Sequence, residues 1–378
     1  MKILHTSDWH LGISFRGRSS EEDQLHFADQ ICSILQSRGI DAMILAGDVF
    51  DRSIASSEAV SLYDRIMTRI AGEMGIPVLC IAGNHDSAER LSQCKQLLRK
   101  SGLYISGSLS RKFDIAEFDD TDIYLLPWFT PEKARAVFHE DAESIKSMED
   151  AYKMVCSKIR ETFKKDKRHI LVSHAYIANA ITSTSDRAAE IGFAARVSKS
   201  VFEGFDYVAL GHIHKEQQLS DQIRYSGSPM PYSFGKEETQ KKGVIIIDTA
   251  DMSQEFIELE PLHARVTLRG EFDDLLNTRY SDDIRNGYVR LEVTDSYVGS
   301  EAMALFNERF PNLLEVKGKD FDRDDASISM SIDEFEEKVD DPLAVFKEYC
   351  KDVLKENAPE ERLEHFNKAL EDYAKEAF

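Results

Sequence analysis

The chain has 378 residues, which is enough for two domains at roughly 150 residues each. Hydrophobic residues make up 42% of it and charged residues 30%, and these proportions exclude a mainly disordered, collagen-like or coiled-coil protein. The 68 acidic residues outnumber the 47 basic ones and give a net charge of −21, which argues against a protein whose whole surface binds nucleic acid.

The predicted strands of the first two thirds are short apolar runs rich in β-branched residues, and segments of helical period lie between the early ones. The predicted strands are residues 2–6, 43–46, 78–82, 170–173, 207–210 and 244–247, and the predicted helices are 25–37, 57–73 and 89–99. This alternation predicts an α/β protein with a largely parallel sheet that is covered on both faces.

The composition changes after residue 265. Residues 266–378 hold 15 basic and 29 acidic residues, so they carry −14 of the net charge. Predicted strands at 287–293, 312–316 and 328–332 and a helix at 301–310 indicate a small α+β domain. Two amphipathic helices are predicted at 343–355 and 360–377. We therefore expect a large α/β domain in residues 1–265, an α+β domain in 266–341 and a helical pair in 342–378.

The cysteines and the apolar segments predict a cytoplasmic protein outside the membrane. The five cysteines are widely spaced, and none forms a C-x-x-C pair, as is usual for reduced thiols. The N-terminus lacks the apolar core of a signal peptide, and no stretch approaches 18 apolar residues.

Side chains that can bind metal ions follow five of the predicted strands. Because the carboxyl ends of parallel strands meet at one edge of a sheet, we expect these side chains to form one site. Seven candidate ligands are too many for one tetrahedral zinc ion, but they suit two ions that share a bridging carboxylate. The set has no thiolate and favours Mn²⁺, with Fe²⁺ or Mg²⁺ as alternatives. Two such ions promote phosphoester hydrolysis. The candidate ligands are Asp8, His10, Asp48, Asn84, His174, His212 and His214.

These motifs, taken in order, resemble the calcineurin-like metallophosphoesterase superfamily. The motifs are Asp8-x-His10, Gly47-Asp48, Gly83-Asn84-His85-Asp86, His174 and Gly211-His212-x-His214. Residues 5–12, 225–229 and 342–349 are further similar to the nuclease subunits of bacterial complexes between a nuclease and an ATPase. The resemblance implies a layered fold with largely buried parallel and mixed sheets in a nuclease domain, then a small α+β capping domain and a C-terminal helical pair.

The resemblance also implies a role for each site residue. Asp8, His10, Asp48 and His214 would hold one ion, and Asp48, Asn84, His174 and His212 would hold the other. His85 would approach the scissile phosphate as a general acid without binding metal. Asp51 would orient and charge His85 through a hydrogen bond between its carboxylate and the imidazole.

Candidate DNA contacts are the basic residues near the predicted ligands, although each of them is also explained as an ordinary solvated charge. They are Arg16, Arg18, Arg52, Arg196 and Lys199.

Three segments are candidates for contacts with partner chains. The apolar stripes of the C-terminal pair would pack on their own domain or, as the resemblance implies, grip the coiled-coil base of the ATPase. The resemblance further implies a homodimer through helices 57–73 and 89–99. The stripe residues are Leu343, Phe346, Cys350, Val353 and Leu354 on the first helix, and Leu363, Phe366, Leu370 and Tyr373 on the second.

The expected function is that of a metal-dependent DNA nuclease subunit that works with an ATPase in DNA repair and recombination. The resemblance implies 3′–5′ exonuclease activity on double strands and endonuclease activity on single strands and hairpins. Two alternatives remain at this point. One is a small-molecule or nucleotide phosphodiesterase of the same superfamily, which Arg52 slightly favours, and the other is a scaffold subunit with a vestigial metal site.

Overall fold

The computed structural model describes residues 1–186, 196–296, 298–318, 347, 363 and 366. The chain divides into two compact units. The first consists of Met1–Thr267, Tyr280–Arg290 and Phe310–Leu314. The second consists of Leu268–Arg279, Leu291–Arg309 and the residues from Glu315 onward.

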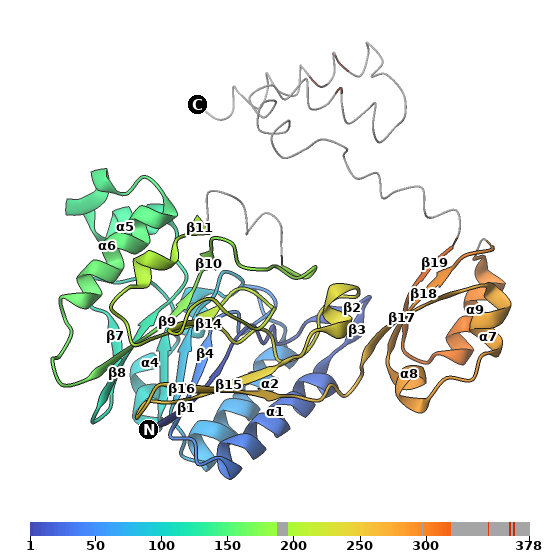
Figure 1. Ribbon diagram of the computed structural model, residues 1–378, viewed down its shortest axis with the longest axis horizontal. Coiled ribbons are helices and arrows are strands. Elements are labelled where there is room, and N and C mark those ends of the chain that lie inside the picture. The colour runs from blue at the N-terminus through green and yellow to red at the C-terminus, as the bar shows by residue number, and fades with distance from the viewer. Residues whose placement is uncertain (187–195, 297, 319–346, 348–362, 364–365, 367–378) are drawn as a thin grey trace. The chain divides into compact units, whose positions relative to one another are not determined.

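Two six-stranded sheets form the centre of the first unit (Figure 1). In the first sheet, β1, β4, β5 and β6 are parallel, and β15 and β16 are antiparallel to their neighbours. Its strand order is β16 (Ser253–Glu258), β15 (Gly243–Asp248), β1 (Lys2–Thr6), β4 (Ala42–Ala46), β5 (Val78–Ile81) and β6 (Leu103–Ser106).

The second sheet has a parallel centre with one antiparallel strand at each edge. The central strands β14, β12, β9 and β8 are parallel, and β13 and β7 are antiparallel. Its strand order is β13 (Gln217–Gln218), β14 (Ile223–Tyr225), β12 (Tyr207–Gly211), β9 (Arg168–His174), β8 (Thr121–Leu126) and β7 (Asp114–Glu117).

The two sheets pack face to face. One buried apolar cluster joins Ile3, Ile44 and Leu79 of the first sheet with Ile170 and Val172 of the second. The central strands are therefore buried on both faces, which explains why they are continuous apolar runs and do not alternate.

Helices cover the outer face of each sheet, and Figure 1 shows α1 and α2 on one side of the pair and α5 and α6 on the other. Phe27 and Ile31 of α1 pack with Leu4 and Met43 of the first sheet. The α6 helix begins with a capping box between Ser147 and Asp150. The helix bounds are Glu21–Ser37 (α1), Ser57–Met67 (α2), Pro131–Val137 (α5) and Met148–Arg160 (α6).

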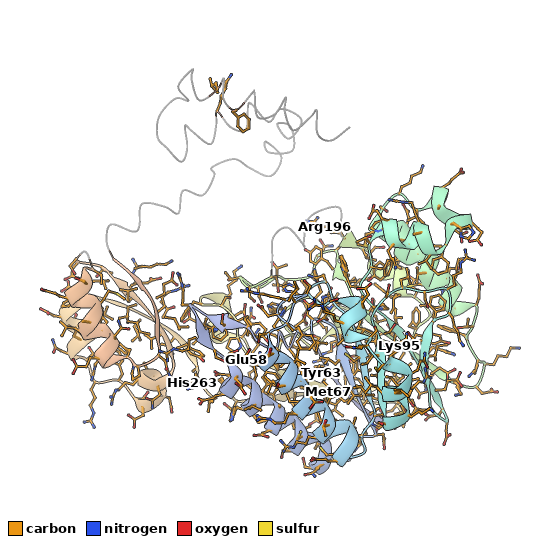
Figure 2. All side chains as sticks on the ribbon, turned by 180° about the vertical axis from the view of Figure 1, so that it is seen from behind. Glu58, Tyr63, Met67, Lys95, Arg196 and His263 are labelled. Carbon is orange, nitrogen blue, oxygen red and sulfur yellow. The ribbon has the colours of Figure 1, made fainter. Side chains whose placement is uncertain are left out.

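The predicted strands are confirmed, and they belong to two sheets, as the resemblance implied, whereas the alternation of strands and helices alone predicted one. The second sheet begins with β7 and β8, which were not predicted. The helix predicted at 89–99 is wrong, because α3 (Ala88–Leu91) and α4 (Lys95–Leu98) are separated at Cys94, whose φ of 56° is left-handed. The helix predicted at 57–73 is α-helical to Met67 and continues as the π-helical turn η1 (Thr68–Glu73), and Figure 2 labels Glu58, Tyr63 and Met67 along α2.

Short elements complete the described chain. They are β2 (Ser14–Phe15), β3 (Arg18–Ser19), β10 (Tyr176–Ile177) and β11 (Arg196–Val197), and the 3₁₀ turns η2 (Arg99–Ser101), η3 (His139–Ser144), η5 (Lys199–Phe202) and η6 (Lys236–Thr239).

Between residues 265 and 318, the structure describes a three-stranded sheet and three helices. The strand order is β17 (Arg265–Gly270), β18 (Tyr288–Val293) and β19 (Leu313–Lys317). In the second unit, Phe272 of α7 (Phe272–Asn277) contacts Phe306 of α9 (Ser300–Arg309), with ring centroids 5.1 Å apart. The first unit contributes α8 (Asp282–Asn286). The strands predicted at 287–293 and 312–316 and the helix at 301–310 are confirmed within one or two residues.

The strand predicted at 328–332 lies outside the described residues. So do the predicted helices 343–355 and 360–377, except for Lys347, Leu363 and Phe366, which are helical. No helix in the described part of the chain is both long and apolar enough to cross a membrane.

Candidate metal centre

Five strand ends from the two sheets meet at one cluster of polar side chains, and four of them line a cavity of about 240 Å³. Strands β1, β4 and β5 of the first sheet end at Asp8-x-His10, Asp48 and Asn84-His85. Strands β9 and β12 of the second sheet end at His174 and His212-x-His214. The cavity is lined by His10, Ile13, Asp48, Asp51, His85, Ser185, Asp186, His212, His214, Tyr232 and Ser233.

Asp48 lies at the centre of this arrangement. Its Oδ2 atom is 3.4 Å from Nε2 of His174, 3.7 Å from Nε2 of His10 and 3.9 Å from Nε2 of His85. Its Oδ1 atom accepts a hydrogen bond from the main-chain N–H of His85 at 3.0 Å. Burial alone would raise the pKa of Asp48, but His174 and the other imidazoles lower it well below its usual value. The Asp48 carboxylate is therefore ionised.

A main-chain acceptor fixes the orientation of the His174 ring. Nδ1 of His174 lies 2.9 Å from the carbonyl oxygen of Ala46, so it carries the proton and donates it. The other ring nitrogen, Nε2, faces the Asn84 side-chain oxygen at 2.8 Å, and His212 Nδ1 lies 2.9 Å from that same oxygen. Burial lowers the pKa of His174, but Asp48 and then Asp8 outweigh this effect and raise it to about 9.

A second pair of imidazoles, those of His10 and His214, lines the cavity. Nε2 of His10 lies 3.1 Å from Nε2 of His214. Burial lowers the pKa of His10 to about 4 and that of His214 well below its usual value, so both rings are neutral near pH 7. Nδ1 of His10 is buried and has no hydrogen-bond partner among the described residues. Leaving such an atom unpaired costs about 1–3 kcal/mol.

The donor atoms fit divalent metal ions. Two groups of buried carboxylates and imidazoles have ligand atoms within 4.8 Å of one another, Asp8–His10–His214 and Asp8–Asp48–His174. Burial raises the pKa of Asp8 to about 7, although His174 acts in the opposite direction. Two carboxylates buried side by side, together with neutral imidazoles and an unpaired ring nitrogen, form an environment that a divalent cation would stabilise.

Glycines allow this close packing of strand ends. A Cβ atom on Gly47, whose φ is +88°, would lie 2.5 Å from Nδ1 of His174. One on Gly83 would lie 2.1 Å from Oδ1 of Asp48, and one on Gly211 would lie 2.0 Å from the carbonyl oxygen of Ala46. These three positions therefore require glycine.

The predicted partner of His85 needs a correction. Nδ1 of His85 lies 2.8 Å from the main-chain oxygen of Asp51, so this hydrogen bond uses the backbone and not the Asp51 carboxylate. The carboxylate instead pairs with Nε of Arg52 at 3.3 Å. The main-chain carbonyl group fixes the tautomer of the imidazole, and a carboxylate oxygen of Asp51 lies within 4.8 Å of ring nitrogens of His85 and His10.

Several polar residues of the site were not predicted from the sequence. The Asp86 carboxylate accepts hydrogen bonds from the main-chain N–H groups of Val49, Phe50 and Gly83, and so holds two ligand loops together. Its place beside Asn84-His85 could have indicated such a role. The other residues are Ser185, Asp186, Tyr232 and Glu237, which approach His10 and His214 from distant parts of the sequence.

The five basic candidates for DNA binding do not gather at the cavity. Arg16 is exposed in the turn between β2 and β3, and Arg18 donates to the side chain of Asn312 and, at 2.8 Å, to the main-chain oxygen of Pro311. Arg52 lies beside the cavity residue Asp51, and its side chain is 77% exposed. Arg196, labelled in Figure 2, lies on β11.

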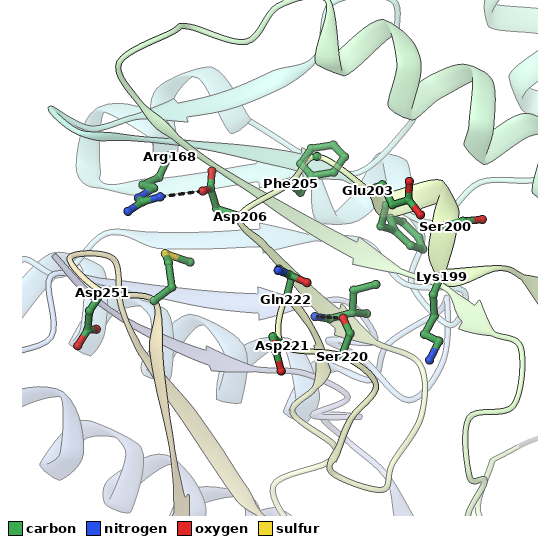
Figure 3. Close-up of a pocket in the computed structure, with 14 residues that line it drawn as sticks. Arg168, Lys199, Ser200, Glu203, Phe205, Asp206, Ser220, Asp221, Gln222 and Asp251 are labelled. Atoms are coloured by element: carbon green, nitrogen blue, oxygen red, sulfur yellow. Dashed lines mark hydrogen bonds and ion pairs between the residues drawn. The ribbon is translucent and has the colours of Figure 1, made fainter.

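Lys199 lines a different cavity, of about 800 Å³, at the amino ends of β9, β12 and β14 (Figure 3). Its ammonium group donates to the main-chain oxygen of Leu219 at 3.1 Å, and Arg168, on the opposite side of the cavity in Figure 3, pairs with Asp206. The metal cluster lies at the carboxyl ends of these parallel strands, so the structure separates Lys199 from it.

A family model described as calcineurin-like phosphoesterase matches residues 1–216, which is more than half of the chain. The layered fold and the Asp/His cluster at its strand ends define a phosphoesterase. The chain belongs to the calcineurin-like phosphoesterase family.

Known proteins of similar sequence are named as nuclease subunits. The SbcD subunit of the nuclease SbcCD from Staphylococcus saprophyticus is 31% identical over 325 residues, which cover 85% of this chain and 86% of that protein. The protein of the same name from Staphylococcus epidermidis is 30% identical over 326 residues, with the same coverage. Among solved structures, TT1561 of Thermus thermophilus aligns with a TM-score of 0.40 and 13% identity over 68% of this chain and 99% of its own.

Proposed function

We propose that this chain is the nuclease subunit of an SbcCD-type complex and hydrolyses phosphodiester bonds of DNA. The observation that carries the proposal is the buried cluster around Asp48, where carboxylates and imidazoles from five strand ends lie together beside one cavity. The names of the two staphylococcal relatives support DNA as the substrate.

In this proposal the cluster holds two divalent ions, and the proposed metal is Mn²⁺. Asp8, His10 and His214 bind one ion, Asn84, His174 and His212 bind the other, and Asp48 bridges them. The short distances from Asp48 Oδ2 to three imidazoles support the bridging role. When bound, two such ions activate a water molecule and neutralise charge on the attacking and leaving oxygens.

His85 is proposed to supply the proton to the leaving oxygen. Its Nδ1 atom is held by the main-chain oxygen of Asp51, so its Nε2 atom is the one that lies on the cavity side, 3.9 Å from Asp48 Oδ2. Because Nδ1 keeps its proton against the Asp51 carbonyl, Nε2 donates from the doubly protonated ring and is left with a lone pair when the leaving oxygen takes the proton. Arg16, Arg52 and Arg196 remain proposed contacts to the DNA backbone.

One assay tests the substrate and the role of His85 together. Purified protein with Mn²⁺ is offered a labelled DNA hairpin, a duplex with one labelled 3′ end, and a small bis-aryl phosphodiester. The expected result is DNA cleavage that His85→Leu reduces at least about 100-fold, as loss of a general acid does. His139→Leu changes an exposed histidine and is the matched control, expected to cleave normally.

The outcomes separate the three candidate functions. Cleavage of only the small ester would instead support a small-molecule phosphodiesterase, and cleavage of neither substrate would support a scaffold. Loss of the 3′ label before internal label would support the proposed 3′–5′ direction, and internal cutting at the hairpin would support the endonuclease activity.

We further propose that residues 342–378 bind the coiled-coil base of an SbcC-type ATPase. These residues lie outside the described part of the chain, apart from Lys347, Leu363 and Phe366, and the proposal depends on their apolar stripes. Truncation after residue 341 is expected to abolish co-purification with the ATPase while DNA cleavage by the free subunit persists. Co-purification of the truncated chain with the ATPase would contradict the proposed binding role of residues 342–378.

A homodimer is proposed through the surface of α2 and α4. Leu62 and Ile66 of α2 are buried in the core of the chain itself, but Val60 of α2 is 50% exposed and Leu97 of α4 is 65% exposed. Ile54, just before α2, is 71% exposed. A second copy would cover these side chains. A monomer in sedimentation at micromolar concentration would contradict the proposal.

A further inference from the structure

His214 is surrounded by buried polar groups that bind no metal in the proposed function. Ser185 Oγ lies 2.5 Å from Nδ1 of His214, and Glu237 accepts a hydrogen bond from Ser185 Oγ. Lys242 lies 3.2 Å from Glu237 and donates to the main-chain oxygen of His214 at 2.8 Å. Asp186 accepts from the main-chain N–H of His214 at 3.0 Å.

These contacts place three segments around one imidazole. Ser185 and Asp186 precede β11 in the chain, Glu237 belongs to η6, and Lys242 lies just before β15. Glu237 and Lys242 are 1% and 5% exposed, so each would be costly to bury without the other. We therefore expect this buried pair to have a specific role, which exposed surface charges need not have.

The number of protons available determines the direction of each hydrogen bond. Glu237 accepts from Ser185, from Ser233 Oγ at 2.7 Å and from the main-chain N–H of Tyr232 at 2.9 Å. The ammonium group of Lys242 lies 3.2 Å from Glu237, and all three of these hydrogen bonds are donated to the carboxylate, so Glu237 is ionised and can only accept.

Ser185 has a single hydroxyl proton, and Glu237 receives it. The Ser185 oxygen must therefore accept the hydrogen bond that joins it to Nδ1 of His214. Nδ1 then carries the ring proton, and Nε2, which lies 3.1 Å from Nε2 of His10 at the cavity, presents a lone pair.

We propose that Glu237 is a positioning residue that acts through Ser185 to hold His214 in the tautomer whose Nε2 atom can bind a metal ion. The inference rests on the proposed function, because it takes His214 as a ligand. Lys242 keeps Glu237 in place through contacts to Glu237, to the main chain of His214 and, at 2.9 Å, to Ser228 Oγ. Outer hydrogen-bond partners of this kind fix the tautomer of metal-binding histidines.

The chain offers a matched set of variants. Ser185→Ala removes the nearer acceptor of the His214 proton and leaves Oδ1 of Asp186 at 3.4 Å from Nδ1, whereas Ser185→Thr keeps a hydroxyl. Glu237→Gln introduces an amide that can donate to Ser185, which would then donate to Nδ1 and reverse the tautomer. Ser183→Ala is the control, because Ser183 Oγ lies in the same segment but donates to Gln240 at 3.1 Å.

The test reads the tautomer directly and needs neither DNA nor metal. In metal-free protein with ¹⁵N-labelled histidine, the nitrogen resonances of His214 are expected to show a protonated Nδ1 and an unprotonated Nε2. Glu237→Gln is expected to shift His214 to the other tautomer and Ser185→Ala to shift it in part, because Asp186 Oδ1 remains 3.4 Å from Nδ1. Ser185→Thr and Ser183→Ala are expected to keep the parent pattern.

Mn²⁺ titration by calorimetry is the second measurement. Ser185→Ala is expected to weaken one of two binding events about 10- to 100-fold, as loss of such outer partners typically does, and Ser183→Ala is expected to weaken neither. A protonated Nε2 on His214 in the parent protein, or equal Mn²⁺ affinities for Ser185→Ala and Ser183→Ala, would overturn the proposal. Two normal Mn²⁺ events without DNA cleavage would contradict the proposed nuclease activity and leave this inference intact.

Discussion

At the scale of single residues, Gly47 shows how closely the main chain approaches His174, one of the candidate metal-binding side chains. It combines a left-handed backbone with a Cβ position that would overlap the His174 ring. We predict that Gly47→Ala lowers the free energy of unfolding by more than about 2 kcal/mol, from backbone strain plus overpacking, and weakens Mn²⁺ binding because His174 must move.

Gly39→Ala is the control for this prediction. Gly39 also has a positive φ, +62°, but a Cβ atom there would meet nothing within 4 Å, so only strain of about 1 kcal/mol is expected and no change in Mn²⁺ binding. Urea unfolding and calorimetry on both variants make the comparison. Equal effects of the two substitutions would show that the overlap with His174 does not matter.

His5 is a buried histidine that the proposed chemistry does not use. It contacts the Tyr207 hydroxyl at 3.0 Å and the main-chain oxygen of Leu210 at 3.2 Å, and burial lowers its pKa from 6.5 to about 3. The unfolded chain therefore binds a proton at this position between pH 6.5 and 3 that the folded chain does not. The stabilising contribution is complete above pH 6.5 and is lost as the pH falls toward 3.

We predict that His5→Gln makes the stability of the metal-free protein less sensitive to acid. Urea unfolding between pH 7 and pH 4.5 is expected to show a slope smaller than that of the parent by up to about 1.4 kcal/mol per pH unit. His139→Gln, which changes an exposed histidine, is expected to keep the parent slope. A parallel pH dependence for parent and His5→Gln would refute the prediction.

The residues of the site were predictable where they follow a strand directly. Asp48, His174 and His212 could be placed together because strand ends converge, whatever their separation in the chain. Ser185 and Glu237 could not, because their contact joins positions 52 residues apart and depends on how two loops fold back. The role of Asp51 was assigned to the wrong atom, since the residue type does not reveal when a main-chain oxygen is the nearer acceptor.

At the scale of elements, the sequence predicted where the strands lie but not which strands pair with one another. An apolar run of four to six residues is equally compatible with either sheet, because both are buried on two faces. β8 is buried throughout, yet its sequence TDIYLL begins with polar residues, and the edge strand β7 contains two carboxylates. The break at Cys94 was missed because cysteine has no marked preference for a left-handed backbone.

Asp86 connects two elements by joining the loop after β4 to the loop after β5. Its Oδ2 atom accepts from Val49 and Gly83, and its Oδ1 atom accepts from Phe50 at 2.9 Å. We predict that Asp86→Asn lowers the free energy of unfolding by roughly 1–3 kcal/mol and weakens Mn²⁺ binding, because an amide nitrogen would then face at least one N–H group.

Asp41→Asn is the control for Asp86. The Asp41 carboxylate is exposed and accepts from a single main-chain N–H group, that of Lys2 at 2.7 Å, so a change below about 0.5 kcal/mol is expected. Chemical unfolding and metal titration compare the two variants. If Asp86→Asn bound Mn²⁺ as the parent does, the ligand loops would not depend on this carboxylate.

At the scale of the whole molecule, the acidic charge sets a limit on DNA binding. The net charge is −21, of which −14 belongs to residues 266–378, so residues 1–265 carry −7. Asp8 and Asp48 contribute two of these negative charges, and the divalent ions proposed for the site would offset them. The basic candidates are few, and Lys199 lies away from the metal cluster. Under the proposed function, much of the affinity for DNA must come from the partner ATPase.

We therefore predict that the chain alone binds duplex DNA weakly and that the binding is sensitive to salt. With about three phosphates neutralised, the affinity is expected to fall about 40-fold between 50 and 200 mM salt. Fluorescence anisotropy of a labelled duplex, with Ca²⁺ in place of Mn²⁺ to suppress cleavage, measures the salt dependence.

Arg16→Ala is expected to make the salt dependence of the affinity less steep, by the amount that corresponds to about one phosphate contact. The reason is that it removes one charge from the exposed turn between β2 and β3. Nanomolar binding at 200 mM salt by the isolated chain would show that its acidic surface does not limit DNA binding and that the partner is not needed for affinity.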